Sequence, residues 1–106
     1  MADYDEEGDV LTKSRTKVTE PPMYTVILLN DDYTPMDFVI KVLTSFFHKS
    51  PAESEKIMLD VHHKGTGVCG LYPREIAETK TLQVNEYSRN SGHPLKCRME
   101  KGPVAG

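Results

Sequence analysis

One short run of the chain contains a strand, a polar turn and the start of a helix: Tyr24-Thr-Val-Ile-Leu-Leu-Asn-Asp-Asp-Tyr-Thr-Pro-Met-Asp-Phe-Val-Ile40. Residues 24–29 are β-branched, aromatic or aliphatic, which predicts a strand that is at least partly covered on both faces. Thr34, Pro35 and Asp37 then predict a helix start. They supply a hydroxyl N-cap, a proline at the first helical position and an acid three residues after the cap.

The remaining elements follow from the same kind of pattern. The first helix should present one apolar stripe, formed by Met36, Val39, Ile40, Leu43, Phe46 and Phe47. Ser50-Pro51-Ala-Glu53 starts a second helix that ends at Gly65 and Gly67. Residues 68–72 read as a short strand, 73–90 as a third helix and 95–100 as an alternating strand.

These elements occur in the order β-α-α-β-α-β. Three strands and three helices pack most economically as a small α+β fold, with a three-stranded antiparallel sheet and three helices on one face. Residues 1–22 hold six acids and three bases with scattered apolar positions, so we expect a disordered N-terminal tail. The domain should span residues 23–101, and residues 102–106 should be a short frayed C-terminus.

Composition excludes several classes of function. The 106 residues suffice for one domain, and a formal charge of −3 argues against a general nucleic-acid binder. No apolar run is long enough to span a bilayer, and the first residues lack the pattern of a signal peptide. We therefore expect a cytoplasmic protein with no membrane partner, two reduced cysteines and no need to be more than a monomer.

The polar cluster Asn30-Asp31-Asp32 is the first candidate for chemistry. Asn and Asp are also favoured in ordinary turns, so a turn without further function explains these residues equally well. The second candidate is the pair His62-His63, whose side chains should point about 100° apart on a helix. A carboxylate, an amide oxygen and an imidazole beside apolar side chains would suit the ammonium of a peptide N-terminus, although other ligands fit as well.

Enzyme chemistry finds little support in the sequence. The four histidines and two cysteines show no metal-ligand spacing, and Gly65-Thr-Gly67 precedes a strand instead of opening a helix, so we expect neither a metal nor a cofactor. Cys69 and Cys97 fall in strands, where they read as small buried hydrophobic residues. The main enzymatic alternative uses Asp31 or Asp32 as general base and His62 as acid, without a nucleophile.

Several stretches of the sequence are informative together: the run from Met23 to Ile40, Val61-His62, Cys69-Gly70, residues 75–80 and His93-Pro94-Leu95. With these stretches the chain resembles the ClpS family across residues 21–101. That family consists of bacterial adaptors that deliver N-end rule substrates to the ClpAP protease. The resemblance implies a non-catalytic N-degron adaptor for protein degradation, which binds substrates that begin with Leu, Phe, Tyr or Trp.

The resemblance also implies roles for individual residues. Asn30, Asp31 and His62 would accept the substrate α-amino group, with Asp32 alongside. The first side chain of the substrate would enter a hydrophobic pocket formed by Thr34, Met36, Val39, Met58, Val61 and Leu95. Met36 would be the gate that makes β-branched Val and Ile fit badly.

The resemblance further implies docking on the N-terminal domain of the ClpA unfoldase, through Glu75, Glu78 and Lys80. Charged residues on a helix are otherwise most often an ordinary solvated face. Pro73 departs from the hydroxyl cap of many family members, so the docking helix could begin one residue away. An interaction domain that binds internal motifs or an oligomer partner is the second alternative, and it would not require a free N-terminus.

Overall fold

The computed structural model describes residues 21–104. The predicted tail therefore lies outside the described residues except for Pro21 and Pro22, and its disorder stays a prediction. Six elements follow in the predicted order: β1 (Met23–Leu29), α2 (Met36–Phe46), α3 (Pro51–Lys64), β2 (Thr66–Pro73), α4 (Arg74–Asn90) and β3 (Lys96–Lys101). The expected α+β fold is confirmed. Among the described residues no helix is both long and apolar enough to cross a membrane.

The three strands form one antiparallel sheet in the order β2-β1-β3, with β1 in the centre. The apolar run of β1 is explained by this position, because a central strand is paired on both edges and covered on both faces. Val26 and Leu28 belong to the main core, which also receives residues from all three helices. Thr25 and Ile27, on the other face, are only 2% exposed. Both faces of β1 are thus covered, as predicted.

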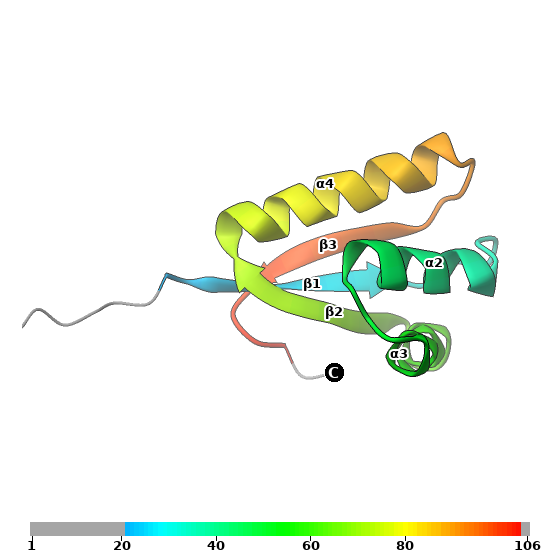
Figure 1. Ribbon diagram of the computed structural model, residues 1–106, viewed down its shortest axis with the longest axis horizontal. Helices are drawn as coiled ribbons and strands as arrows, with labels where there is room; N and C mark the ends of the chain where they lie inside the picture. The colour runs from blue at the N-terminus through cyan, green and yellow to red at the C-terminus, as the bar shows by residue number, and fades with distance from the viewer. Residues whose placement is uncertain (1–20, 105–106) are drawn as a thin grey trace, which may run out of the picture.

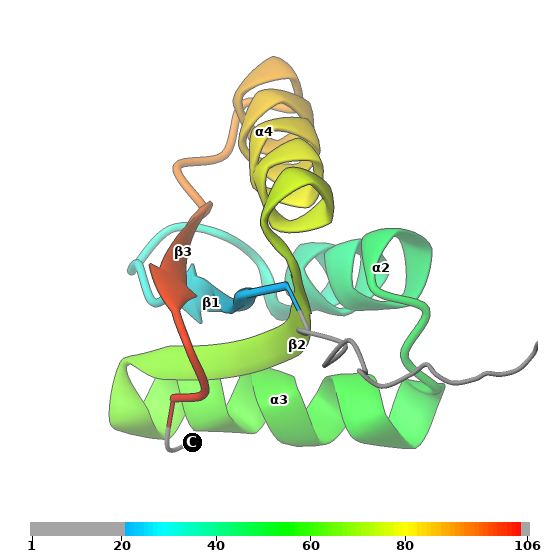
Figure 2. The same ribbon diagram turned by 90° about the vertical axis from the view of Figure 1, so that its left-hand side faces the viewer.

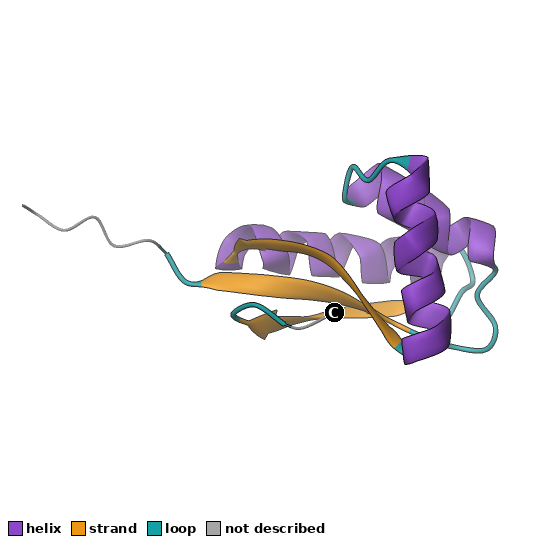
Figure 3. Ribbon diagram, turned by 90° about the horizontal axis from the view of Figure 1, so that it is seen from below, coloured by secondary structure: helices purple, strands orange, loops and turns teal. Residues whose placement is uncertain are grey.

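The helices α2 and α3 gather at the end of the sheet where β1 terminates, whereas α4 runs along the length of the strands (Figure 1). Helix α3 lies crosswise to the strands and is seen end-on in Figure 1 and lengthwise in Figure 2. The view from below shows the same crossing over the end of the sheet (Figure 3). The β1–α2 loop, α2 and α3 are therefore brought together at one end of the molecule.

The start of α2 differs from the prediction. Pro35 occupies the N-cap position and has no side-chain cap, so the expected Thr34 cap is wrong. The Thr34 hydroxyl instead donates to the Asp31 carboxylate at 2.8 Å. The Asp31 carboxylate is ionised, so this hydrogen bond is charge-assisted and stronger than one between neutral groups. Thr34 therefore closes the polar loop and not the helix.

The apolar stripe of α2 is also rotated from the predicted one. Phe38 and Val42 are buried along with the predicted Val39 and Leu43, whereas Met36 is 51% exposed. Ile40 and Phe46 are only partly buried. The reason lies in α4, where the Tyr87 ring stacks on Phe38 at 5.3 Å and thereby adds a buried aromatic that the spacing alone did not indicate.

Helix α3 starts and ends as the sequence predicts. Ser50 forms a capping box with Glu53, and Pro51 stands at the first helical position. Gly65 adopts φ 90°, a left-handed conformation that glycine reaches without a Cβ penalty, and its N–H donates to Val61 O at 3.0 Å. Burial of Met58 and Val61 fixes this helix against the core.

The chain continues in an ordered path beyond β3. The Gly102 N–H donates to Met23 O at 2.7 Å, and the Thr25 hydroxyl donates to Gly102 O at 2.6 Å. Gly102, which we expected in a frayed end, is thus hydrogen-bonded to β1. Residues 105 and 106 of that expected end lie outside the described residues.

Candidate functional site

A cavity of about 240 Å³ opens at the end of β1, between α2 and α3. It brings together every residue that we predicted for the amine site and the side-chain pocket. Its lining consists of Leu29, Asn30, Asp31, Asp32, Thr34, Met36, Val39, Met58, Val61, His62 and Leu95. Polar groups from one loop and one helix thus share a cavity with apolar side chains of α2 and α3 and with Leu95, which directly precedes β3.

The polar loop is held to the end of α3 by the backbone. The Asn30 N–H donates to Gly65 O at 2.9 Å, directly after the left-handed turn that ends the helix. This contact places Asn30 near the last turn of α3, which carries His62. His62 lines the cavity and His63 does not, as expected for neighbours about 100° apart on a helix.

Asp31 organises the loop through its carboxylate. Oδ1 accepts the N–H groups of Tyr33 and Thr34 at 2.8 and 2.7 Å, and Oδ2 accepts the Thr34 hydroxyl. Burial would raise the pKa of Asp31, but these hydrogen bonds and nearby His93 outweigh it and hold the pKa below its usual value. Asp31 is therefore ionised at neutral pH. Its oxygens offer about four acceptor positions, of which three are used.

The depressed pKa of Asp31 sets the direction of its pH dependence. Its folded-state pKa is lower than its ordinary value of 3.8, so its contribution to stability is present above that value. The contribution is lost as the pH falls through the folded-state pKa. The loop should consequently keep its charge and its hydrogen bonds at pH 5.

The apolar part of the cavity is lined by buried side chains, with one exposed side chain at its mouth. Met58, Val61 and Leu95 are 7%, 4% and 2% exposed, and Val39 is equally buried. Leu95 is fixed by the preceding turn, in which the Ser88 hydroxyl donates to His93 O at 3.0 Å. Met36 borders the cavity with half of its side chain exposed. A flexible thioether side chain at the mouth can adapt to what enters.

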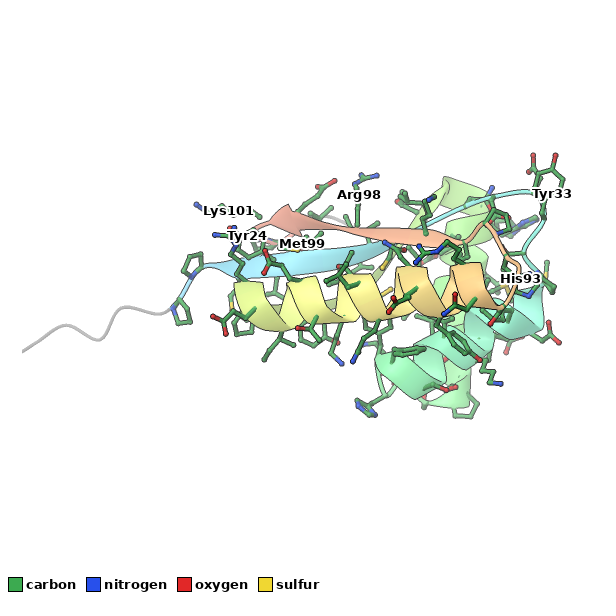
Figure 4. The ribbon with its side chains drawn as sticks, turned by 90° about the horizontal axis from the view of Figure 1, so that it is seen from above. Tyr24, Tyr33, His93, Arg98, Met99 and Lys101 are labelled. Carbon is green, nitrogen blue, oxygen red and sulfur yellow. The ribbon has the colours of Figure 1, made fainter. Side chains whose placement is uncertain are left out.

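Two features of the site were not predicted. Leu29, the last residue of β1, lines the cavity, and only its position beside the polar cluster could have indicated this. His93 lowers the pKa of Asp31 and its ring lies 4.3 Å from Phe38, between centroids. Figure 4 shows His93 at the same end of the molecule as Tyr33, an exposed residue of the polar loop.

The three predicted docking residues lie outside this cavity, on α4. Glu75 and Glu78 are exposed, and Glu78 pairs with Arg74 at 3.3 Å. Lys80 is half-buried, and its ammonium donates to Phe46 O at 2.7 Å. The structure therefore gives Lys80 an internal partner that the two acids do not share.

Metal and thiol chemistry finds no support in the described part of the chain. No group of three or more His, Cys, Asp or Glu residues that could hold a metal ion occurs among residues 21–104. Both cysteines are buried and free. Burial raises the pKa of the Cys97 thiol to about 11 and that of Cys69 further, so neither is a thiolate at neutral pH.

Comparison with known proteins shows which family the chain belongs to. The profile of a family described as "ATP-dependent Clp protease adaptor protein ClpS" matches residues 19–98. The chain belongs to the ClpS family. The resemblance drawn from the sequence is thereby confirmed, and the family's description as protease adaptors denotes a regulatory and not a catalytic role.

Relatives support the assignment over nearly the whole chain. The ClpS adapter protein of Hydrogenovibrio crunogenus is 54% identical over 97 residues, which is 92% of this chain and 93% of the relative. The ClpS of Rhodospirillum centenum is 50% identical over 107 residues, covering 95% and 99%.

A solved structure of a ClpS protein has the same fold. Agrobacterium tumefaciens ClpS2 bound to L-phenylalaninamide superposes with a TM-score of 0.76 at 37% identity, covering 78% of this chain and all of that one.

Proposed function

We propose that this ClpS is an N-degron adaptor of the cytoplasm. It binds the free α-amino group and the first side chain of substrates that begin with Leu, Phe, Tyr or Trp. It then delivers them, as a monomer, to the ClpA unfoldase for degradation by ClpAP. The observation that carries this proposal is the shared cavity, where the acceptors Asn30, Asp31 and His62 border an apolar chamber.

The ligand of the Agrobacterium relative has the chemistry that this cavity requires. L-phenylalaninamide carries a free α-amino group, a benzyl side chain and an amide in place of a carboxylate, and so resembles the first residue of a peptide. A cavity of about 240 Å³ suits one side chain and is smaller than a drug-sized pocket. Burial of a Leu or Phe side chain adds roughly 1.5–3 kcal/mol of binding free energy.

The amine would be held by complementary acceptors. An ammonium has three donors, and leaving them unpaired on burial would be costly. The Asn30 amide oxygen, the remaining acceptor position of Asp31 and the His62 imidazole offer three partners at the cavity mouth, with Asp32 alongside. An acetylated amine loses its charge and two of its donors, and its added group competes for the same space.

Met36 should act as the gate against β-branched first residues. We expect Met36→Ala to widen the cavity mouth, so that peptides beginning with Val or Ile bind about 10-fold more tightly than they bind wild type. Affinity for Phe peptides should change less. Fluorescence anisotropy with labelled peptides measures this. The control is Leu59→Ala, which removes a partly exposed α3 side chain that does not line the cavity. Unchanged discrimination in Met36→Ala would remove Met36 as the gate.

Delivery is tested by degradation in a reconstituted ClpAP reaction. The adaptor should accelerate degradation of a reporter that begins with Phe and leave an otherwise identical Val reporter unaffected. Charge reversal in the variant Glu75→Lys should reduce the acceleration while peptide binding persists. Glu55→Lys, which changes an exposed acid on α3, should behave like wild type. If the adaptor bound Phe peptides but never accelerated degradation, delivery to ClpAP would be wrong.

A further inference from the structure

Asn85 joins helix α4 to the outer edge of strand β3. Its side-chain amide donates to Cys97 O at 3.1 Å, and its amide oxygen accepts the Cys97 N–H at 2.8 Å. β3 is an edge strand of the sheet, and its other edge pairs with β1. An amide side chain has both donors and acceptors, so it can pair with both backbone groups of one strand residue, as a neighbouring strand would. Asn85 therefore closes the edge of β3 at Cys97.

Ser88, which lies one turn further along α4, makes a second two-bond attachment to the same part of the chain. The Ser88 hydroxyl donates to His93 O at 3.0 Å, and the His93 N–H donates to Ser88 O at 2.9 Å. Ser88 is fully buried. Asn85 and Ser88 are three residues apart and are therefore neighbours on one face of the helix. Together they hold positions 93 and 97, the two ends of segment 93–97.

Leu95 lies midway between these two attachments. The pairing of β3 with β1 begins where Lys96 lies opposite Leu29, so Leu95 precedes the paired part of the strand. Leu95 is 2% exposed and lines the cavity at the end of β1. At the start of the segment the His93 ring lies 4.3 Å from that of Phe38 on α2. Segment 93–97 thus supplies one wall of the cavity and contacts the helix that supplies another.

We infer that Asn85 and Ser88 are positioning residues of the cavity: from one face of α4 they hold the two ends of segment 93–97 and so set the position of Leu95 in the cavity wall. Neither residue lines the cavity, so both act through Leu95. This inference rests on the proposed function, because peptide affinity is one of its readouts. β1 still holds the inner edge of β3, so loss of the Asn85 attachment should loosen the segment without unfolding the sheet.

The decisive variant is Asn85→Asp, which keeps the shape of asparagine and replaces the donor to Cys97 O with a second acceptor. Because the two facing oxygens repel each other, we expect the melting temperature to fall by about 4–8 °C. Affinity for a free-amine Phe peptide should fall about threefold to tenfold at a temperature where the variant is folded. Ser88→Ala removes one of the two bonds to His93 and should lower both quantities, by a smaller amount. The matched control is Gln83→Glu, which makes the same amide-to-carboxylate change at an exposed position of α4 and should change neither.

A double-mutant cycle with Leu95→Ala tests whether Asn85 acts through Leu95. If it does, Asn85→Asp should reduce the affinity by less than about twofold once the Leu95 side chain is truncated, although it still lowers the melting temperature. Leu95→Val replaces the alanine variant in the cycle if the double variant does not fold. Hydrogen exchange at the Cys97 amide reports the attachment directly and should be at least about tenfold faster in Asn85→Ala than in wild type.

The outcomes distinguish a clamp on the cavity wall from an ordinary structural contact. Wild-type peptide affinity in Asn85→Asp would overturn the positioning of Leu95, even if the melting temperature fell. An equal loss of affinity with and without the Leu95 side chain would overturn the route through Leu95. If wild type itself bound no free-amine peptide, the proposed function would fail. The attachment would then be judged by stability alone, and equal melting temperatures of Asn85→Asp and Gln83→Glu would overturn it.

Discussion

Replacing Asp31 with alanine should weaken the binding of a peptide that begins with phenylalanine by about 30-fold or more. Truncating one partner of a desolvated, hydrogen-bonded charge pair costs about 2 kcal/mol or more, and 1.4 kcal/mol is a factor of ten in affinity. Asp31 also accepts three hydrogen bonds within its own loop. The alanine variant therefore loses both the charge that we propose for amine binding and the hydrogen bonds that shape the loop.

A second variant separates these two losses. Asn at position 31 keeps a carbonyl oxygen for the N–H groups of Tyr33 and Thr34, and the Thr34 hydroxyl can accept from its amide. Asp31→Asn should preserve the melting temperature but lose most of the peptide affinity. Asp37→Ala, at an exposed acid in the first turn of α2, is the control. If Asp31→Asn bound the peptide as wild type does, Asp31 would not pair with the amine, and Asp32→Ala would be the next variant to measure.

The second large effect is expected at Gly67, where β2 passes under α3. A Cβ at this position would lie 2.6 Å from Val61 Cγ2 and 3.0 Å from both Ile57 Cγ2 and Ile57 O. Because a backbone atom takes part, the helix as a whole must move away from the strand. Overpacking of this kind destabilises by about 1–3 kcal/mol. We expect Gly67→Ala to lower the melting temperature by roughly 5–20 °C.

The same variant should affect the site, because Val61 lines the cavity. A double-mutant cycle with Val61→Ala tests the cause. Removing the Val61 methyl groups relieves the shortest contact, so the double variant should lose less stability than the two single losses combined. Thermal unfolding of wild type, the two single variants and the double variant gives the coupling free energy between positions 61 and 67. Strictly additive losses would mean that the contact between Gly67 and Val61 does not set the packing of α3 on β2.

The fold was predictable where local signals agreed with the tertiary structure. Ser50, Pro51 and Glu53 form the capping box that their spacing indicates, and Gly65 ends the helix in the expected conformation. Thr34 and Asp37 show a similar pattern, yet the cap does not form. The Thr34 hydroxyl donates instead to Asp31, three residues before it, and Pro35 takes the N-cap position. The capping pattern looks only at residues after Thr34 and so does not include this partner.

The residues that line the site could be predicted from the sequence, but the role of each charged residue could not. The residues that the family resemblance indicates for the amine site and the side-chain pocket line one cavity, because the end of β1, the start of α2 and the end of α3 meet there. Lys80 could not be separated from Glu75 and Glu78 in the sequence, since all three are charged residues on one helix. Its partner Phe46 stands 34 residues earlier, and only the tertiary fold brings them together.

The proposed function requires that the cavity binds a free peptide N-terminus. Fluorescence anisotropy with labelled peptides beginning with Phe, Leu and Val, each with a free or an acetylated N-terminus, tests it most directly. We predict tight binding of the free Phe and Leu peptides alone, with acetylation weakening each by at least about 30-fold, the factor that corresponds to a loss of 2 kcal/mol. Equal binding of free and acetylated peptides, or no binding of any, would show that the cavity does not recognise a free peptide N-terminus.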